Sequence, residues 1–588
     1  MSLLTYAEQS NFCQTGRSQE VDRLVAEFAK HWPSAVHAFE YGRSCEGRAM
    51  RAMLVSRSGV LSAAELKRQG VPLLMIQGGI HPGESDGKDG GFIALREMLE
   101  GVVGGDLLER LAILFVPAFN VDGHERFGRW NRPNQVGPEE TGWRTTAQNI
   151  NLNRDHMKAE APEMQAMLRL LNEWDPLICA DLHVTDGADF EPDVSIQVEP
   201  INQGAATLRP SGVRLRDELI AKLAAQGSLP LPFYPDLART DDPASGFQLT
   251  VYSPRFSTGY FPQRNRFTML VETHSWKPYA HRVRVMRNTV VGLAELVALH
   301  GREWLAQVHA ADLEATQIGG TDVILDYASA WREPAQAGGA VTARDSPDAD
   351  LIEFRGFAYT REPSAISGDL VTVYDPTTPQ IWKVPYRHAV EPALVVAAPR
   401  AGYLIPPGFA DLVGAKLALH GIVVQAIHGD RTAHEVEAFR ASRVEFSSLP
   451  FEGRMRARLH GAWQRETQDL FAGTLFVSIA QAKSRLIMAL LEPQAPDSLA
   501  AWGFFNACFE QKEHMEPYVA EQIAREMLAA DPELQEEFTR KLAVDAAFAA
   551  NPVARLEFFL RRHASWDVRY NLYPVLRVAA APSLARES

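Results

Sequence analysis

Residues 71–84 read VPLLMIQGGIHPGE, an apolar run followed by a glycine pair, a histidine and a glutamate. The run 71–76 is short and has no helical period, which predicts a buried strand. The glycines interrupt the run, so His81 and Glu84 lie just beyond the carboxyl end of the expected strand. Imidazole nitrogen and carboxylate oxygen are both ligands that zinc favours. The pair is therefore a candidate half of a zinc site, although His-x-x-Glu alone is a weak signal.

Two later apolar runs end in residues that could belong to the same site. His183 follows the run 177–182, and Glu272 follows the run 267–271. The carboxyl ends of parallel strands meet at one edge of a sheet, so His183 is expected to emerge beside His81. Burying an unpaired carboxylate is costly, so Glu272 is expected to have a task, such as general base beside a metal-bound water. His274 has the same side-chain parity as Glu272 and is the rival ligand.

Arginines surround these strand ends. The segment 149–154, NINLNR, alternates amide and apolar side chains before Arg154, and Arg129 and Arg132 lie in an upstream loop with Gly128 and Trp130. A guanidinium group binds a carboxylate through two parallel hydrogen bonds. We therefore expect this polar segment to hold an anionic group of a ligand.

The rest of the sequence indicates an α/β domain followed by β-rich and helical parts. Strands and helices alternate up to about residue 310, which is typical of a sheet covered by helices. The expected strands are 51–55, 71–76, 112–117, 177–182, 195–198 and 267–272, and the expected helices are 18–32, 91–100, 162–173, 213–226 and 284–300. Later β-rich runs at 321–326, 351–360, 370–374, 393–398, 418–427 and 444–446 predict a domain like a β-sandwich, and residues 512–561 predict helices.

We accordingly divide the chain into four parts. These are an N-terminal helical segment (1–44) packed on the next domain, an α/β domain (45–312), a β-rich accessory domain (313–450) and a mixed, mainly helical C-terminal region (451–588). A chain of 588 residues is too long for a single core, which agrees with several domains.

Composition excludes several classes of protein. The formal net charge of −14 argues against a nucleic-acid partner, which would require a basic face. Four scattered cysteines predict neither a cysteine metal site nor a disulfide scaffold. No apolar stretch is long enough to predict a membrane span. The first residues lack a signal-peptide pattern, which indicates a cytoplasmic protein, or an exported or periplasmic one whose signal peptide was removed.

The ordered set His81-x-x-Glu84, Asn120-Val121-Asp122-Gly123, Asn153-Arg154, His183 and Glu272 resembles the M14 family of zinc carboxypeptidases over roughly residues 45–300. The resemblance implies a carboxypeptidase-like mixed sheet covered by helices. It implies one Zn²⁺ per chain, held by His81, Glu84 and His183, with Glu272 as the catalytic base. It also implies that Arg154, aided by Asn153, binds the substrate's terminal carboxylate. The family's oxyanion arginine is best matched by Arg129, with Arg132 as the fallback, and its substrate-site tyrosine by Tyr252 or Tyr260.

One position departs from the family pattern. Asn151 stands where family members usually have an aspartate that orients the first zinc histidine. An amide can accept a hydrogen bond from imidazole but supplies no charge. We therefore expect this histidine to act on the bound metal differently than in family members with an aspartate.

The implied reaction is hydrolysis of the C-terminal amide bond of peptides by a metal-activated water. Three alternatives stay open. They are an N-acyl amino acid amidohydrolase of the desuccinylase or aspartoacylase kind, a carboxypeptidase of cell-wall peptides, and an inactive relic of a metal site used as a binding module. For the enzymes, the expected partner is a peptide or small amide with a free carboxylate.

Overall fold

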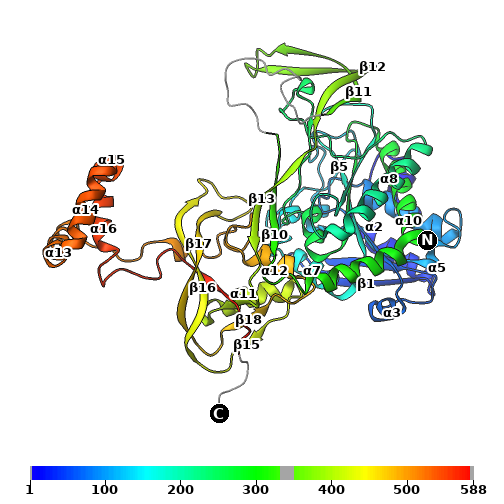
Figure 1. Cartoon of the computed structure of the whole chain (residues 1–588). Coiled ribbons are helices and arrows are strands. Elements are labelled where there is room, and N and C mark those ends of the chain that lie inside the picture. Colours follow the sequence, from blue (N-terminus) through cyan, green and yellow to red (C-terminus); the bar gives the residue numbers. More distant parts are fainter. Residues whose placement is uncertain (1–2, 332–349, 583–588) are drawn as a thin grey trace.

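An eight-stranded mixed sheet forms the centre of the first part of the chain (Figure 1). The structure is a computed structural model that describes residues 3–331 and 350–582. The strand order is β1-β2-β4-β3-β5-β9-β6-β7. The bounds are β1 Val36–Arg43, β2 Ala49–Val55, β3 Leu73–Gly78, β4 Ala112–Val116, β5 Ile178–Val184, β6 Val194–Glu199, β7 Pro230–Leu231 and β9 Phe267–Thr273. Strands β4, β3, β5 and β9 run parallel, and every residue in them is buried, as expected for inner strands covered on both faces.

Helices cover both faces of this sheet. Alternate residues of each strand point to opposite faces, so the sheet contributes to two cores. One core contains side chains of α2 (Ser18–His31), α4 (Asp86–Glu100), α8 (Arg209–Ala225) and α10 (Tyr279–Ala315). The other contains α3 (Ala63–Gln69) and α7 (Pro162–Trp174). The predicted α/β class is confirmed, and α10 is longer than the helix predicted at 284–300.

The C-terminal region, by which we mean from here on the described residues 316–331 and 350–582, packs in part on the α7 face. Its helices α11 (Pro407–Leu419) and α12 (Ser484–Leu491) share the core that contains α7. Beyond them lies a six-stranded antiparallel sheet with the order β15-β18-β14-β19-β16-β17. The bounds are β14 Gly402–Ile405, β15 Gln425–Ala426, β16 Arg431–Phe446, β17 Ala457–Leu470, β18 Leu475–Ser478 and β19 Leu572–Val578.

Two expectations about this region need correction. The strand predicted at 418–427 is largely wrong, because α11 extends to Leu419 and only Gln425–Ala426 pair. The boundary expected at residue 450 falls in the hairpin between β16 and β17, which pair with each other along their length. Likewise, the N-terminal segment 1–44 is not only helical, since β1 forms an edge of the eight-stranded sheet.

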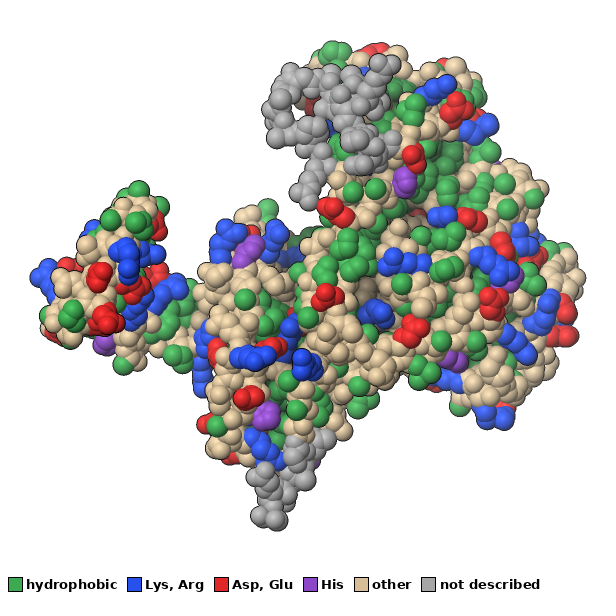
Figure 2. Space-filling model, in the orientation of Figure 1, with side chains coloured by type: hydrophobic (Ala, Val, Ile, Leu, Met, Phe, Trp, Pro, Cys, Tyr) green, Lys and Arg blue, Asp and Glu red, His purple; other side chains and the backbone are tan. Residues whose placement is uncertain are grey.

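Two features project from the body (Figure 1). The first is the long hairpin of β11 (Asp350–Pro363) and β12 (Leu370–Arg387), whose base pairs with β8 (Phe247–Gln248), beside the separate pair β10 (Asp322–Ser329) and β13 (Val390–Ala397). The second is a helical module of α13 (Pro517–Ala530), α14 (Pro532–Val544), α15 (Ala546–Ala549) and α16 (Pro552–Leu560) around its own phenylalanine-rich core. Figure 2 shows acidic and basic side chains mixed over the visible face of this module. Within the described ranges, no helix has the length and apolar character needed to cross a membrane.

Candidate metal and peptide-binding site

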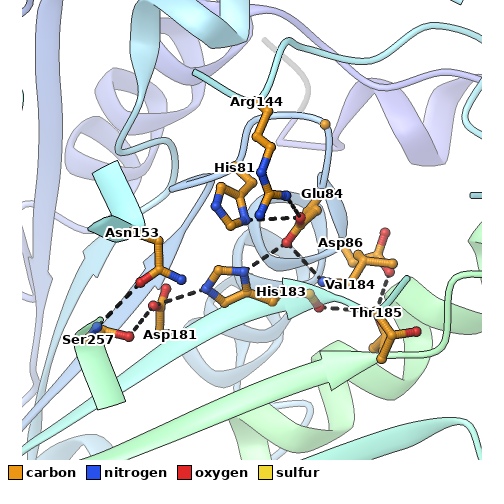
Figure 3. A network of polar contacts seen from close by, with 12 residues as sticks. His81, Glu84, Asp86, Arg144, Asn153, Asp181, His183, Val184, Thr185 and Ser257 are labelled. Atoms are coloured by element: carbon orange, nitrogen blue, oxygen red, sulfur yellow. Dashed lines mark hydrogen bonds and ion pairs between the residues drawn. The ribbon is translucent and has the colours of Figure 1, made fainter. Parts of the chain in front are cut away.

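His81, Glu84 and His183 converge at the carboxyl edge of β3 and β5 (Figure 3). His81 Nδ1 lies 3.1 Å from Glu84 Oε1, and His183 Nδ1 lies 2.8 Å from Glu84 Oε2. One candidate ligand atom from each residue lies within 4.8 Å of the others. Two imidazole nitrogens and a carboxylate match the ligand set of a catalytic zinc site, which keeps its fourth position for water or substrate. The three side chains therefore fit the metal that their sequence pattern implies.

The outer ring nitrogens of both histidines are also engaged. His81 Nε2 lies 3.1 Å from Asn151 Oδ1, which confirms that this amide contacts the first histidine. His183 Nε2 lies 3.0 Å from Asp181 Oδ2. Because the Nε2 atoms face these partners, the Nδ1 atoms are the ones turned toward Glu84. The protein thus presets which nitrogen of each ring can bind a metal.

Burial and charge set the protonation of the three residues. Burial lowers the pKa of His81 to about 4, so this ring is neutral and ready to bind a cation. Burial would raise the pKa of Glu84, but Arg132 and the two histidines hold it well below its ordinary value. Burial would lower the pKa of His183, but Asp181 and Glu84 hold it well above the ordinary value. A metal ion bound here would take the place of the proton on His183 Nδ1.

A cavity of about 200 Å³ opens beside these residues. Glu272, at the end of β9, lines it and is paired in register with His183 on β5. Burial raises the pKa of Glu272 to about 8, and the nearby Glu84 adds to the effect. The cavity is lined by His81, Glu84, Arg144, Asn153, Arg154, His183, Val184, Asp186, Tyr234, Tyr252, Phe256, Ser257, Thr258, Leu270 and Glu272.

Arg154 is a basic group that lines this cavity, as do its neighbour Asn153 and residues 256–258. Its guanidinium lies over the ring of Phe256 and donates to the carbonyl of Asn153 at 2.8 Å. Within residues 3–331 and 350–582, no carboxylate forms an ion pair with it. Burial, together with the charges of Arg144 and Arg255, lowers the pKa of Arg154 to about 10, so the group is still a cation at neutral pH. An unpaired, partly buried cation facing a cavity suits an anionic ligand group.

The other predicted arginines occupy different places. Arg129 is exposed and stacks on Trp130, so the structure does not bring it to the cavity. Arg132 lies behind the site, with its guanidinium 3.0 Å from Glu84 and its stem packed on Gly83, where an added Cβ would meet Arg132 Cγ at 2.5 Å. Arg144 lines the cavity and approaches Glu84 at 3.6 Å. The sequence analysis missed Arg144, which comes from an irregular loop without a motif.

Of the predicted tyrosines and the rival histidine ligand, one lines the cavity and the others do not. Tyr252 lines the cavity, whereas Tyr260 is fully buried and bonded to His420 at 2.9 Å. His274 stacks on Phe190 and contacts Thr185, away from the three candidate ligands. Tyr234, which the sequence analysis did not single out, lines the cavity beside Tyr252.

A second group of possible ligands, Cys45, Asp122 and Glu163, lies elsewhere. Asp122 accepts hydrogen bonds from Ser44 and Arg48, both at 2.6 Å, so its charge is already compensated. We assign this group to stabilising the turn at residues 44–48.

Comparison with known proteins agrees with this geometry. Residues 21–188 match the family model described as zinc carboxypeptidase, peptidase family M14, a stretch that includes His81, Glu84, Asn153, Arg154 and His183. This part of the chain is similar to the M14 zinc carboxypeptidases.

Similar proteins extend the likeness to carboxypeptidases beyond the matched stretch. The chain is 24% identical to carboxypeptidase 2 of Trichophyton rubrum over 476 residues, covering 78% of this chain and 79% of that protein. It is also 24% identical to carboxypeptidase 2 of Trichophyton tonsurans over 478 residues, with 78% and 79% covered.

Among solved structures, a metallo-carboxypeptidase from Pseudomonas aeruginosa in complex with (2-guanidinoethylmercapto)succinic acid has 19% identity and a TM-score of 0.35, covering 49% of this chain and 69% of that one. The carboxypeptidase A of Helicoverpa armigera has 15% identity and a TM-score of 0.35, covering 51% of this chain and 75% of that one. At such TM-scores, the likeness says nothing about the site. The family match and the relatives named carboxypeptidase support a zinc metallopeptidase, and Glu272 lies outside the matched stretch.

Proposed function

We propose that this protein is a carboxypeptidase of the M14 kind, which removes the C-terminal residue of peptides by zinc-assisted hydrolysis of the terminal amide bond. The observation that carries the proposal is one cavity that joins the three candidate ligands, Glu272 and the unpaired Arg154. The two Trichophyton proteins named carboxypeptidase 2 support hydrolysis from the C-terminal end. His81, Glu84 and His183 would hold one Zn²⁺, which when bound supplies a Lewis acid for the scissile carbonyl and acidifies a water molecule.

Glu272 is the proposed general base. It lines the cavity, and burial raises its pKa to about 8 although the charges of His183 and Arg132 oppose this rise. A carboxylate of raised pKa accepts a proton more readily than a solvated one, and it can then pass this proton to the leaving amine. The negative charges of Glu84 and Asp186 nearby strengthen this tendency.

Arg154 and Arg144 are the proposed electrostatic partners of the substrate. Arg154 would bind the terminal carboxylate, with Asn153 fixed beside it through the Ser257 N–H, which donates to Asn153 Oδ1 at 3.3 Å. This clamp positions the last amide bond of the peptide against the metal. Arg144 takes the role expected of Arg129, because it is the arginine that lines the cavity near Glu84 and can meet charge developing on the carbonyl oxygen.

Glu272→Gln tests the mechanism. This variant should bind zinc in the same stoichiometry as the wild type but lose hydrolysis by about 10²- to 10⁴-fold, the usual contribution of a positioned acid–base group. Zinc content is measured by elemental analysis and turnover with peptides that have a free C-terminus. As a control, Glu521→Gln removes an exposed carboxylate that does not line the cavity and should keep the activity of the wild type. Full activity in the Glu272→Gln variant would refute the role.

Substrate class is tested in the same assay. Peptides with a free C-terminus, cell-wall stem peptides and N-acyl amino acids are offered at equal concentration. The proposal requires peptides to be cleaved and N-acyl amino acids to be poor substrates, whereas the reverse order would favour an amidohydrolase. If no hydrolysis is seen on any of them in zinc-loaded protein, the chain is a binding module.

A further inference from the structure

The two candidate zinc histidines have different partners behind them, and Figure 3 shows the one behind His183, which is Asp181. Behind His81, the Nε2 atom meets the neutral amide of Asn151 at 3.1 Å. Behind His183, the Nε2 atom meets the carboxylate of Asp181 at 3.0 Å. The only charge in direct contact with an outer imidazole nitrogen at this site, within the described residues, therefore stands behind the second histidine.

Asp181 is held rigidly in this place. It is fully buried on β5, where its register partner on β3 is Gln77. The Gln77 amide donates to Asp181 Oδ1 at 2.9 Å, and the Ser257 hydroxyl donates to Asp181 Oδ2 at 2.6 Å. Both carboxylate oxygens are thus anchored, so the group can fix the orientation of the imidazole and not merely neutralise it.

The same contacts connect the metal site to the carboxylate clamp. Ser257 bonds Asp181 through its hydroxyl and Asn153 through its backbone N–H, at 2.6 Å and 3.3 Å. A continuous chain therefore runs from His183 through Asp181 and Ser257 to Asn153, beside Arg154, as Figure 3 shows up to Asn153. The first contact of this chain is the ion pair between His183 Nε2 and Asp181 at 3.0 Å, and a carboxylate in this place behind a metal-bound imidazole orients the ring and strengthens the ligand.

We propose that Asp181 is the positioning carboxylate of this zinc site and that it acts on His183, while Asn151 leaves His81 without a charged partner. The inference rests on the proposed zinc site. Asp181 touches neither substrate nor metal, and its effect is transmitted through the His183 ring. Its removal should weaken metal binding itself, which a residue that served only the fold would leave unchanged in the folded protein.

The test measures zinc affinity by competition with a chromogenic chelator on the full-length protein. Asp181→Asn should weaken zinc binding about 10- to 100-fold, the usual effect of losing such a partner. It should also shift the visible absorption of the Co²⁺-loaded protein, since the field of the His183 ligand changes. Wild-type affinity and an unchanged Co²⁺ spectrum in this variant would overturn the proposal.

A charge-swap variant separates charge from packing. In Asp181→Asn/Asn151→Asp, a carboxylate stands behind His81 in place of His183, and zinc affinity should recover in large part. A double variant that binds zinc as weakly as Asp181→Asn would show that the loss came from packing, and this would overturn the proposal.

If Asp181→Asn does not fold, the Asp181→Glu variant is measured in its place, because it keeps the charge but displaces it by one methylene. It should weaken zinc several-fold, and unchanged affinity counts against the proposal. Absence of zinc binding by the wild type would instead refute the proposed function.

Discussion

At the scale of single residues, Arg154 gives the clearest prediction. Replacing it with methionine should raise KM for peptides with a free C-terminus about 10- to 100-fold, because a hydrogen bond to a charged group contributes roughly 1.5–3 kcal/mol. The KM for the same peptides with an amidated C-terminus should stay unchanged. Arg129→Met is the matched control, since Arg129 is exposed and away from the cavity, and it should behave like the wild type. Equal losses on both kinds of peptide in Arg154→Met would remove Arg154 from the clamp.

Residues at strand ends were predictable from the sequence, and residues in loops were not. His81, His183 and Glu272 each follow an apolar run, and parallel strands bring such ends together by geometry. Arg144 comes from an irregular segment, where no period indicates which side chain points inward. For the same reason spacing could not choose between Tyr252 and Tyr260, although only Tyr252 reaches the cavity.

At the scale of elements, the end of α11 is fixed by a buried histidine. His420 contacts the hydroxyl of Tyr260 through Nδ1 at 2.9 Å and the carbonyl of Met157 through Nε2 at 3.1 Å, so it joins the C-terminal region to the α/β domain. Burial lowers the pKa of His420 to about 3, below the ordinary value of 6.5. The unfolded chain therefore binds a proton that the folded chain refuses between these values, and stability falls as the pH decreases from about 6.5.

His420→Gln tests this dependence. At pH 7 the wild type should have the higher unfolding temperature, because the histidine makes both contacts in its neutral form. Between pH 7 and pH 5 the wild type should lose about 2 kcal/mol relative to the variant, from roughly 1.4 kcal/mol per pH unit below 6.5. The two midpoints, followed by circular dichroism, should therefore approach each other or cross. A constant difference would show that the protonation of His420 is not linked to folding.

Some of the strands and helices were predictable from the sequence and others were not. The strands β3, β4, β5 and β9 were predicted because each is a compact apolar run between turn residues. Residues 418–427 are equally apolar, and periodicity alone does not distinguish a short buried strand from the end of a helix. The long pairs β11–β12 and β16–β17 extend beyond the predicted runs because backbone pairing, and not burial, sustains their exposed ends.

At the scale of the whole molecule, the C-terminal region contacts the segments that carry the clamp. Asp497 is 1% exposed and pairs with Arg255 at 3.0 Å, and the carboxylate of Glu452 accepts from the backbone N–H of Asn151 at 2.9 Å. Arg255 and Arg154 both lie over the ring of Phe256, at 5.2 Å and 4.1 Å from its centroid. Displacing Arg255 should therefore displace the clamp.

Asp497→Asn tests this coupling. Removing one partner of a buried ion pair is strongly destabilising, and a small displacement of a positioning group can cost on the order of 10- to 100-fold in catalysis. We expect a lower unfolding temperature and a raised KM for free C-terminal peptides, with zinc content unchanged. Glu521→Gln, which breaks an exposed pair with Arg525 in the helical module, is the control and should alter neither. An unchanged KM in Asp497→Asn would show that the contact of the C-terminal region with Arg255 does not affect substrate binding.

The strand order of the six-stranded sheet determines when the sheet can be completed during synthesis of the chain. β19 lies between β14 and β16 and pairs with both, yet it is made after every other strand of the sheet and after the helical module. Until β19 is made, no strand joins the group β15-β18-β14 to the pair β16-β17, so each group has an open edge. The helical module, whose core is its own, can fold during this interval. The sheet beside the clamp is therefore closed late, and until then its edges need protection from pairing with other chains.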